Sequence, residues 1–174
     1  MNCPDAPLRE TIFRIFLNLQ DMVKYAEAKN SAVAASAGAI VLLIYQKLGF
    51  TTWPQLLFST GYCLIVLALV LSFWSFFPVI NNPPSLKSAP GTDSRERNLF
   101  LFSEIASFPE FASFEQAIVK KYYGSEALSP LDRDILIGVY ANACIAHKKF
   151  RFFRYALLLF LSGILLLVIS GPLL

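Results

Sequence analysis

The stretch Tyr155–Leu174, YALLLFLSGILLLVISGPLL, decides the fold of this chain. It has twenty residues without a charge, and about twenty apolar residues are what a helix needs to cross a hydrocarbon core of roughly 30 Å. Backbone polar groups in lipid are satisfied only inside a helix or a closed barrel. The stretch therefore predicts a transmembrane helix.

The charges outside this stretch predict the topology. Four basic residues stand just before it: Lys148, Lys149, Arg151 and Arg154. Of the fifteen Lys and Arg residues, all but Lys47 fall in segments 1–30 and 78–154, which also hold all twelve acidic residues. Because basic flanks mark the cytoplasmic side of a span, we expect the N-terminus and the central region in the cytosol, three crossings, and the C-terminus outside.

Composition agrees with a membrane protein that has a modest cytosolic part. The 174 residues are 56% hydrophobic and 16% charged, and the mean hydropathy is +0.55. This is too apolar for a soluble domain of this length and too charged for a chain wholly in lipid. The predicted fold class is an all-α integral membrane protein, with three transmembrane helices and a small cytosolic helical bundle built on helices continuous with the spans.

The domain organisation follows from apolar periodicity and from breakers. An amphipathic pattern covers residues 8–28 and runs without a breaker into the apolar residues 31–45, which predicts one long helix whose first part either packs on protein or lies on lipid. The expected segments are a cytosolic amphipathic helix (1–30), a transmembrane hairpin (31–77, with spans at about 31–46 and 56–77), a flexible Pro/Ser/Gly/Asn-rich linker (78–97), a cytosolic helical sensor region (98–154) and a third span (155–174).

Small residues dominate the first span. Ser31 and Ala35, like Ala34 and Gly38, are four residues apart and form a ridge that lets another helix approach closely. Packing within one protomer or between protomers would use this ridge equally well. We expect protomers to associate through it.

The sensor region reads as short helices followed by a long one. Residues 98–106 have helical spacing, and Ser107-Phe108-Pro109-Glu110 has the form of a capping box that opens a second helix. Ser129-Pro130 is typical of another helix start, from which apolar positions continue at helical spacing into the last span. The final element is therefore expected to be one helix of about forty residues.

No catalytic or metal-binding pattern is present in the sequence. His147 is the sole histidine and lacks Cys or carboxylate partners at metal-ligand spacing. Nucleophile-elbow, zinc-protease, dinucleotide and P-loop patterns are all missing. The spans also lack the acidic and basic residues that mark ion pathways. We expect no enzyme activity, no cofactor and no metal.

The sensor region is basic and aromatic, which suits a phosphate-bearing ligand whose base stacks on a ring. The residues that supply such chemistry are Arg95 and Arg97 at the end of the linker, and Asn98, Phe102, Lys120, Lys121, Tyr122 and Tyr123 in the sensor region. The alternative is that the charges are solvated and the rings belong to a core. Basic residues beside the last span could also contact anionic lipid headgroups.

Four stretches together resemble one family, the transmembrane effectors of bacterial Pycsar anti-phage defence. Ala26-Glu27-Ala28-Lys29 is similar to the Ala-Asp-x-Lys-Ala that ends the family's opening helix, and Pro78 closes the second span. Asn98–Ala106, NLFLFSEIA, resembles a family segment of the type Asn-Leu-x-Phe-Phe-Gly-x-Ile, and a long helix from Asp132 through Lys148 and Lys149 enters the last span. Order and spacing agree across nearly the whole chain.

The resemblance implies a cytosolic sensor for a cyclic nucleotide, with a cyclic mononucleotide favoured and a dinucleotide possible. Binding would rearrange or assemble the spans as a homo-oligomer, damage the bacterial inner membrane and arrest the infected cell. Lys29 and Arg97 stand at the ends of matching motifs and are expected to help bind the ligand. No DNA or RNA partner is expected.

Two other classes of function compete with this interpretation. A membrane scaffold or assembly subunit would use the cytosolic helices to dock a protein, and would show a stable partner and no nucleotide effect. A small channel-forming protein without a nucleotide ligand would cause leakage upon expression alone.

Overall fold

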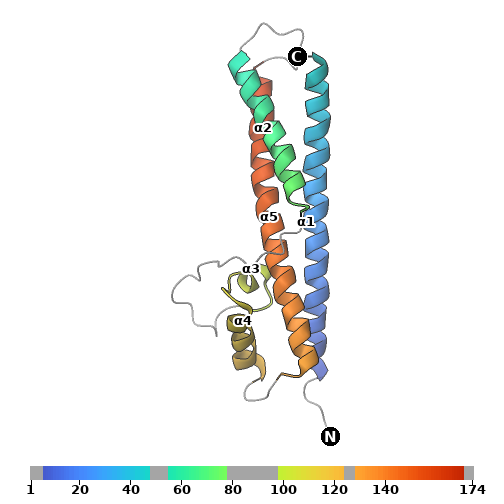
Figure 1. The fold of residues 1–174 in the computed structure, drawn as a ribbon, viewed down its shortest axis with the longest axis vertical. Helices are drawn as coiled ribbons and strands as arrows, with labels where there is room; N and C mark the ends of the chain where they lie inside the picture. Colours follow the sequence, from blue (N-terminus) through green and yellow to red (C-terminus); the bar gives the residue numbers. More distant parts are fainter. Residues whose placement is uncertain (1–5, 48–54, 78–97, 124–127, 171–174) are drawn as a thin grey trace. The chain divides into compact units, whose positions relative to one another are not determined.

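The computed structural model describes residues 6–47, 55–77, 98–123 and 128–170, which fold as helices joined by turns and contain no strand. Figure 1 shows the elements in chain order. They are α1 (Ala6–Lys47), α2 (Gln55–Trp74), α3 (Phe102–Ile105), α4 (Phe111–Ile118), the π-helix η1 (Val119–Tyr123) and α5 (Pro130–Ile169). The predicted all-helical class is confirmed for these residues, and so are the two long helices over residues 6–47 and 130–169.

The chain divides into two compact units. The first contains Met1–Lys24 and Ile80–Lys148, and the second contains Tyr25–Val79 and Lys149–Leu174. α1 and α5 each contribute residues to both units. We call them the sensor unit, after the sensor region predicted from the sequence, and the span unit.

Large side chains form the core of the sensor unit. Phe114 of α4 is fully buried, with its ring centroid 5.7 Å from that of Phe108 and 5.9 Å from that of Tyr140. The Tyr140 hydroxyl donates to the Phe108 carbonyl at 3.0 Å, so the polar end of this buried ring is satisfied. The other buried core residues are Ile12, Leu19, Leu99, Ile105, Ala106, Ala117, Ile118, Leu136, Val139, Ala143 and Cys144.

The predicted start of α5 is confirmed. The Ser129 hydroxyl accepts a hydrogen bond from the Asp132 backbone N–H at 3.2 Å and donates to the Asp132 carboxylate at 2.6 Å. That carboxylate also pairs with Arg9 of α1 at 2.9 Å. The same aspartate thus completes the helix cap and ties the first turns of α1 and α5 together within the sensor unit.

The predicted capping box at Ser107–Glu110 is wrong. α4 begins at Phe111, and its N-cap residue Glu110 makes no side-chain cap hydrogen bond. The Ser107 hydroxyl instead donates to the Glu104 carbonyl at 2.7 Å and closes the end of α3. The reason is packing, because Phe108 is buried in the core and the chain must turn there before the next helix can begin.

Small residues set the contacts of the span unit. A Cβ atom placed on Gly163 of α5 would lie 2.8 Å from the Gly61 carbonyl oxygen of α2, so the two backbones touch at this crossing. A Cβ atom on Gly38 of α1 would lie 3.9 Å from the nearest Leu69 side-chain atom of α2, which is an ordinary contact. The buried cluster contains Ala37, Ile44, Phe58, Ile65 and Leu167.

Among the described residues, three helices are long and apolar enough to cross a membrane, as predicted: Arg9–Tyr45, Leu56–Trp74 and Pro130–Ile169. Their most apolar windows are only 28%, 28% and 17% buried within the chain. Most of this apolar surface therefore needs surroundings that the chain itself does not supply, and a bilayer supplies them.

Some predicted segments lie wholly or partly outside the described residues. The linker at 78–97, the turn between the first two spans and the last residues of the third span lie outside the described residues. The α-helical part of the second span ends at Trp74, three residues before the predicted Phe77, and Ser75–Phe77 form a turn. The boundaries between cytosolic and spanning segments stay predictions.

Candidate functional site

The predicted ligand residues divide between the two units. Asn98, Phe102, Lys120 and Lys121 belong to the sensor unit, and Lys29 belongs to the span unit. Arg95 and Arg97 lie outside the described residues.

In the sensor unit, two aromatic rings in contact and a lysine form a group that could receive a planar ligand. Phe100 and Tyr122 have ring centroids 5.3 Å apart and an interplanar angle of 32°. The Lys121 ammonium lies 5.6 Å from the centroid of the Tyr122 ring. We call Phe100, Lys121 and Tyr122 the ring platform. An aromatic pair with a cation beside it suits a heterocyclic base joined to a phosphate.

The other predicted residues of this unit have different surroundings. The Asn98 side-chain oxygen accepts a hydrogen bond from the Phe100 backbone N–H at 3.1 Å, so Asn98 shapes the turn that presents Phe100. Phe102 is half-buried against the core and acts in part as packing. Lys120 is exposed and belongs to η1, the same π-helix as Lys121.

Sequence reasoning missed Phe100 and the π-helix that carries the lysines. Val119–Tyr123 continues directly from α4 with i→i+5 hydrogen bonding. Such π-helical turns are rare in proteins, and those that occur are often found at functional sites. No propensity pattern announces a π-helix, although the two lysines and two tyrosines that it carries were visible in the sequence as residues suited to a phosphate-bearing ligand. The contact between the Phe100 and Tyr122 rings joins residues far apart in the chain, so it can be recognised only once the fold is known.

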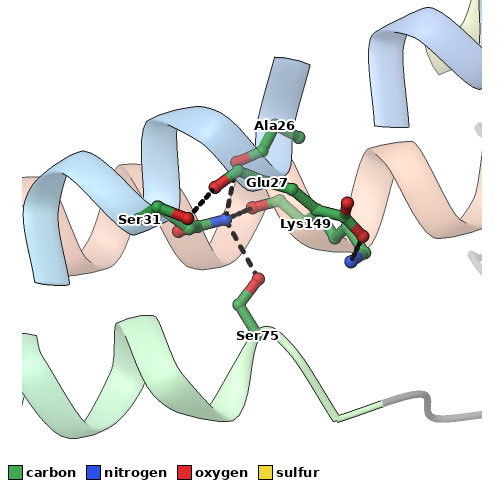
Figure 2. Close-up of polar contacts among 6 residues, drawn as sticks. Ala26, Glu27, Ser31, Ser75 and Lys149 are labelled. Carbon is green, nitrogen blue, oxygen red and sulfur yellow. Dashed lines mark hydrogen bonds and ion pairs between the residues drawn. The ribbon is translucent and has the colours of Figure 1, made fainter. Parts of the chain in front are cut away.

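In the span unit, the buried Asn30 connects α1, α5 and the end of α2. Figure 2 shows its partners Ala26, Lys149 and Ser75, one from each of these segments. The Asn30 side-chain nitrogen donates to the Ala26 carbonyl at 3.0 Å, to the Ser75 hydroxyl at 3.0 Å and to the Lys149 carbonyl at 3.4 Å. Asn30 is 0% exposed. Because two of these acceptors are backbone carbonyls, the amide nitrogen, not the oxygen, must face them.

Two buried polar atoms of this unit have no hydrogen-bond partner among the described residues, the Asn30 side-chain oxygen and the Ser72 hydroxyl. Ser72 and Ser75 are three residues apart and share one face at the end of α2. Nearby, Glu27 forms an ion pair with Lys149, whose side chain is only 14% exposed. Buried polar groups in an apolar helix bundle are costly to leave unsatisfied, so this cluster fixes the register of the helices.

Lys29, one residue before the asparagine, lies among three aromatic rings. Its ammonium is 4.3 Å from the centroid of the Tyr25 ring, 5.2 Å from that of Phe153 and 5.8 Å from that of Phe150. The described residues offer it no hydrogen bond or ion pair. We call Tyr25, Lys29, Phe150 and Phe153 the lysine cage.

The small-residue ridge of the first span has two different faces. Ala34 is buried, and Gly38 is half-buried and faces Leu69 of α2 within the chain. Ser31 and Ala35 are exposed, and the Ser31 hydroxyl donates to the Glu27 carbonyl of its own helix at 2.9 Å. Association of protomers through these residues stays a prediction.

The described residues contain no group of three or more His, Cys, Asp or Glu side chains placed to hold a metal ion. His147 is half-buried on α5.

Comparisons with known proteins agree with this architecture. The family model for the PycTM Pycsar effector protein domain matches residues 11–174. The chain is 27% identical over 157 residues to the Pycsar effector protein RsPycTM of a Rhizobium species, covering 84% of this chain and 85% of that relative. No solved structure matches. Three apolar helices and a family match over nearly the whole chain lead to one conclusion: this membrane protein belongs to the transmembrane Pycsar effector family of anti-phage defence.

Proposed function

We propose that this chain is a non-enzymatic membrane effector that senses a cyclic nucleotide in its sensor unit and then disrupts the bacterial inner membrane. The observation that carries the proposal is the family match over residues 11–174, which includes both the sensor unit and the apolar helices. The match therefore supports a function in which one chain contains both a sensor and the part that acts on the membrane.

The ring platform supports a nucleotide as the ligand. One base can stack on the exposed side of the Phe100–Tyr122 pair, and stacking of a base on an aromatic side chain contributes about 1–3 kcal/mol. Lys120 and Lys121, both on the π-helix that carries Tyr122, then supply cations for the phosphate. One ring pair with two lysines matches one base and one phosphodiester, so a cyclic mononucleotide is favoured and a dinucleotide is the alternative.

The membrane output is supported by the continuity of α1 and α5. Each is one helix that contains residues of the sensor unit and residues of an apolar span. A ligand changes the spans only if it binds one arrangement better, and about 5.5 kcal/mol of differential affinity moves a population from 1:99 to 99:1. We propose a homo-oligomer as the active form, with a cytosolic sensor unit and the C-terminus outside.

The test is the thermal stability of the detergent-purified protein in the presence of a panel of cyclic mononucleotides and dinucleotides. A ligand that binds only the folded state, at 100 times its dissociation constant, stabilises it by about 2.7 kcal/mol. A rise in the melting temperature with one nucleotide supports the proposal and identifies the messenger. A flat response across the panel in a folded sample contradicts it.

Two variants connect the response to the ring platform. Tyr122→Leu removes the stacking ring and Lys121→Gln removes the cation, and each should reduce the nucleotide-induced rise. Lys24→Gln is the matched control, because Lys24 is exposed in the same unit and pairs with Asp21. Liposomes loaded with a dye then test the output, since leakage should require the nucleotide.

A further inference from the structure

The lysine cage carries a cation that the described residues leave unneutralised. Among the side chains that the structure describes in the span unit there is one carboxylate, Glu27, and there are four cations: Lys29, Lys149, Arg151 and Arg154. Glu27 pairs with Lys149. Lys29 has aromatic rings on several sides and no acceptor among the described residues, so its three N–H donors are available to a ligand.

The lysine cage lies where the charged residues of α1 and α5 end and their uncharged spans begin. After Lys29, α1 carries no charge up to Tyr45, and after Arg154, α5 carries none up to Ile169. The hydrogen bond from Asn30 to Ser75 brings the end of α2 to this level. Trp74 and Phe77 at that end are 58% and 67% exposed, and exposed aromatic residues beside uncharged spans are typical of the lipid headgroup level.

The rings restrict where the ammonium can go. A free lysine at the end of a span extends its side chain towards water, whereas Lys29 is half-buried between α1 and α5 of the span unit. Tyr25 is 53% exposed, so the cage is open at the protein surface. Arg151 and Arg154, three residues apart on one face of α5, add exposed positive charge at the same level.

We propose that the lysine cage is a binding site for the phosphate of an anionic phospholipid headgroup. The Lys29 ammonium donates to a phosphate oxygen, and the acyl chains of the lipid lie along the uncharged surfaces of α1 and α5. The positive charge of the site complements an anionic lipid, and the aromatic rings lie at the depth where headgroup and hydrocarbon meet. This site is separate from the nucleotide proposal, which rests on the sensor unit.

The experiment measures lipid adducts on the full-length protein by native mass spectrometry in a neutral detergent. Short-chain phosphatidylglycerol and short-chain phosphatidylcholine are titrated against the wild type, Lys29→Gln, Lys29→Arg and the control Lys24→Gln. Lys29→Gln should bind phosphatidylglycerol about fivefold more weakly, the factor expected from about 1 kcal/mol per basic residue at a membrane surface. Lys29→Arg and Lys24→Gln should retain most of the binding, and phosphatidylcholine should bind all four proteins alike.

Three outcomes overturn the proposal. One is that Lys29→Gln binds phosphatidylglycerol as well as Lys24→Gln does. Another is that glycerol 3-phosphate displaces the lipid at an equal concentration, which would make the ligand a free phosphate compound. The third is that Lys29→Gln loses a cyclic-nucleotide stabilisation and keeps lipid binding, which would assign Lys29 to the messenger as the sequence predicts.

A second variant keeps the proposal testable if Lys29→Gln is not recovered in folded form. Tyr25→Leu changes an exposed residue, keeps the ammonium and removes the nearest ring of the cage. It should reduce the preference for phosphatidylglycerol over phosphatidylcholine. An unchanged preference would contradict the role of the rings.

Discussion

The sensor unit and the span unit are built from parts of the same two long helices, yet they are held together by different means. The core of the sensor unit contains large side chains such as Phe114, Leu99 and Leu136, all nearly fully buried. In the span unit, α2 and α5 touch through Gly61 and Gly163, and the buried residues include Asn30 and Ser72.

The surfaces differ in the same sense. Many large apolar side chains of the span unit are exposed, among them Leu42, Leu67, Leu158 and Leu165. In water, burial of large apolar groups is the main driving force for packing. In lipid, that force is absent, and helices associate through close backbone approach and polar contacts. One continuous helix can therefore pack by burial of large apolar side chains along one part of its length and by close backbone approach along another.

The largest expected effect is at the centre of the sensor core. Phe114→Ala removes a fully buried ring that contacts Phe108 and Tyr140, and should lower the free energy of unfolding by about 3–5 kcal/mol. Leu158→Ala in the span unit is the control, because this side chain is 53% exposed on an apolar helix and should change stability by less than about 0.5 kcal/mol. Denaturation in mixed micelles measures both. Equal losses for the two variants would break the comparison.

The next effect is at the glycine crossing of the span unit. A Cβ atom on Gly163 would lie 2.8 Å from the Gly61 carbonyl oxygen and 2.6 Å from an Ile65 side-chain atom, so α2 and α5 must move apart. Gly163→Ala should destabilise the protein by about 1–3 kcal/mol, the usual cost of overpacking. The measurement is the melting temperature in detergent.

Gly38→Ala is the matched control for this variant. Its Cβ atom would meet nothing closer than 3.9 Å, and replacing Gly by Ala inside a helix usually gains about 0.5–1 kcal/mol. Gly38→Ala should therefore be neutral or stabilising. If both variants lose stability equally, backbone approach at Gly163 is not what holds the span unit.

The contrast between Gly38 and Gly163 shows which features of the fold could be predicted from the sequence. Hydropathy and charge suffice to predict three apolar helices and the long helices over residues 6–47 and 130–169, because they depend on local pattern. The ridge of Ala34 and Gly38 was also visible as spacing. That Gly163, in an ordinary Leu-rich run, makes the closest contact depends on the crossing point of two helices, which no local pattern contains.

The candidate site divides in the same way. Lysines 120 and 121 could be proposed from composition, because a phosphate needs cations. Their partner Phe100 and the π-helix depend on tertiary contacts. Asn30 was missed because one amide between Lys29 and a run of small residues looks like the last polar turn of a helix, although it is completely buried and reaches Ser75 and Lys149.

The polar cluster offers a smaller and more specific test. Asn30→Leu removes the hydrogen bonds to Ser75 and to the Lys149 carbonyl, but it also removes the unpartnered Asn30 oxygen. Side-chain hydrogen bonds between membrane helices contribute about 0.6 kcal/mol on average, so the loss of stability should be about 0.5–1.5 kcal/mol.

A double-mutant cycle with Ser75→Ala isolates the contact between the two side chains. The coupling energy should be about 0.5 kcal/mol or more, because the pair shares one hydrogen bond. Additive effects would mean that Asn30 acts through the Ala26 and Lys149 carbonyls and not through α2.

The smallest effect is expected at the helix crossing of the sensor unit, where it decides whether the two units really differ. A Cβ atom on Gly138 of α5 would lie 2.7 Å from the Phe16 ring, a shorter distance than that between Gly163 and the Gly61 oxygen. The atom in the way is here the far edge of a half-buried side chain, which can turn, and not a backbone oxygen. Displacing the ring from its rotamer costs about 0.5–1.5 kcal/mol, and the helix gains about 0.5–1 kcal/mol from Ala, so Gly138→Ala should change stability by less than about 1 kcal/mol. A melting-temperature loss as large as that of Gly163→Ala would mean that backbone approach sets the crossing in the sensor unit too, and the two packing rules would reduce to one.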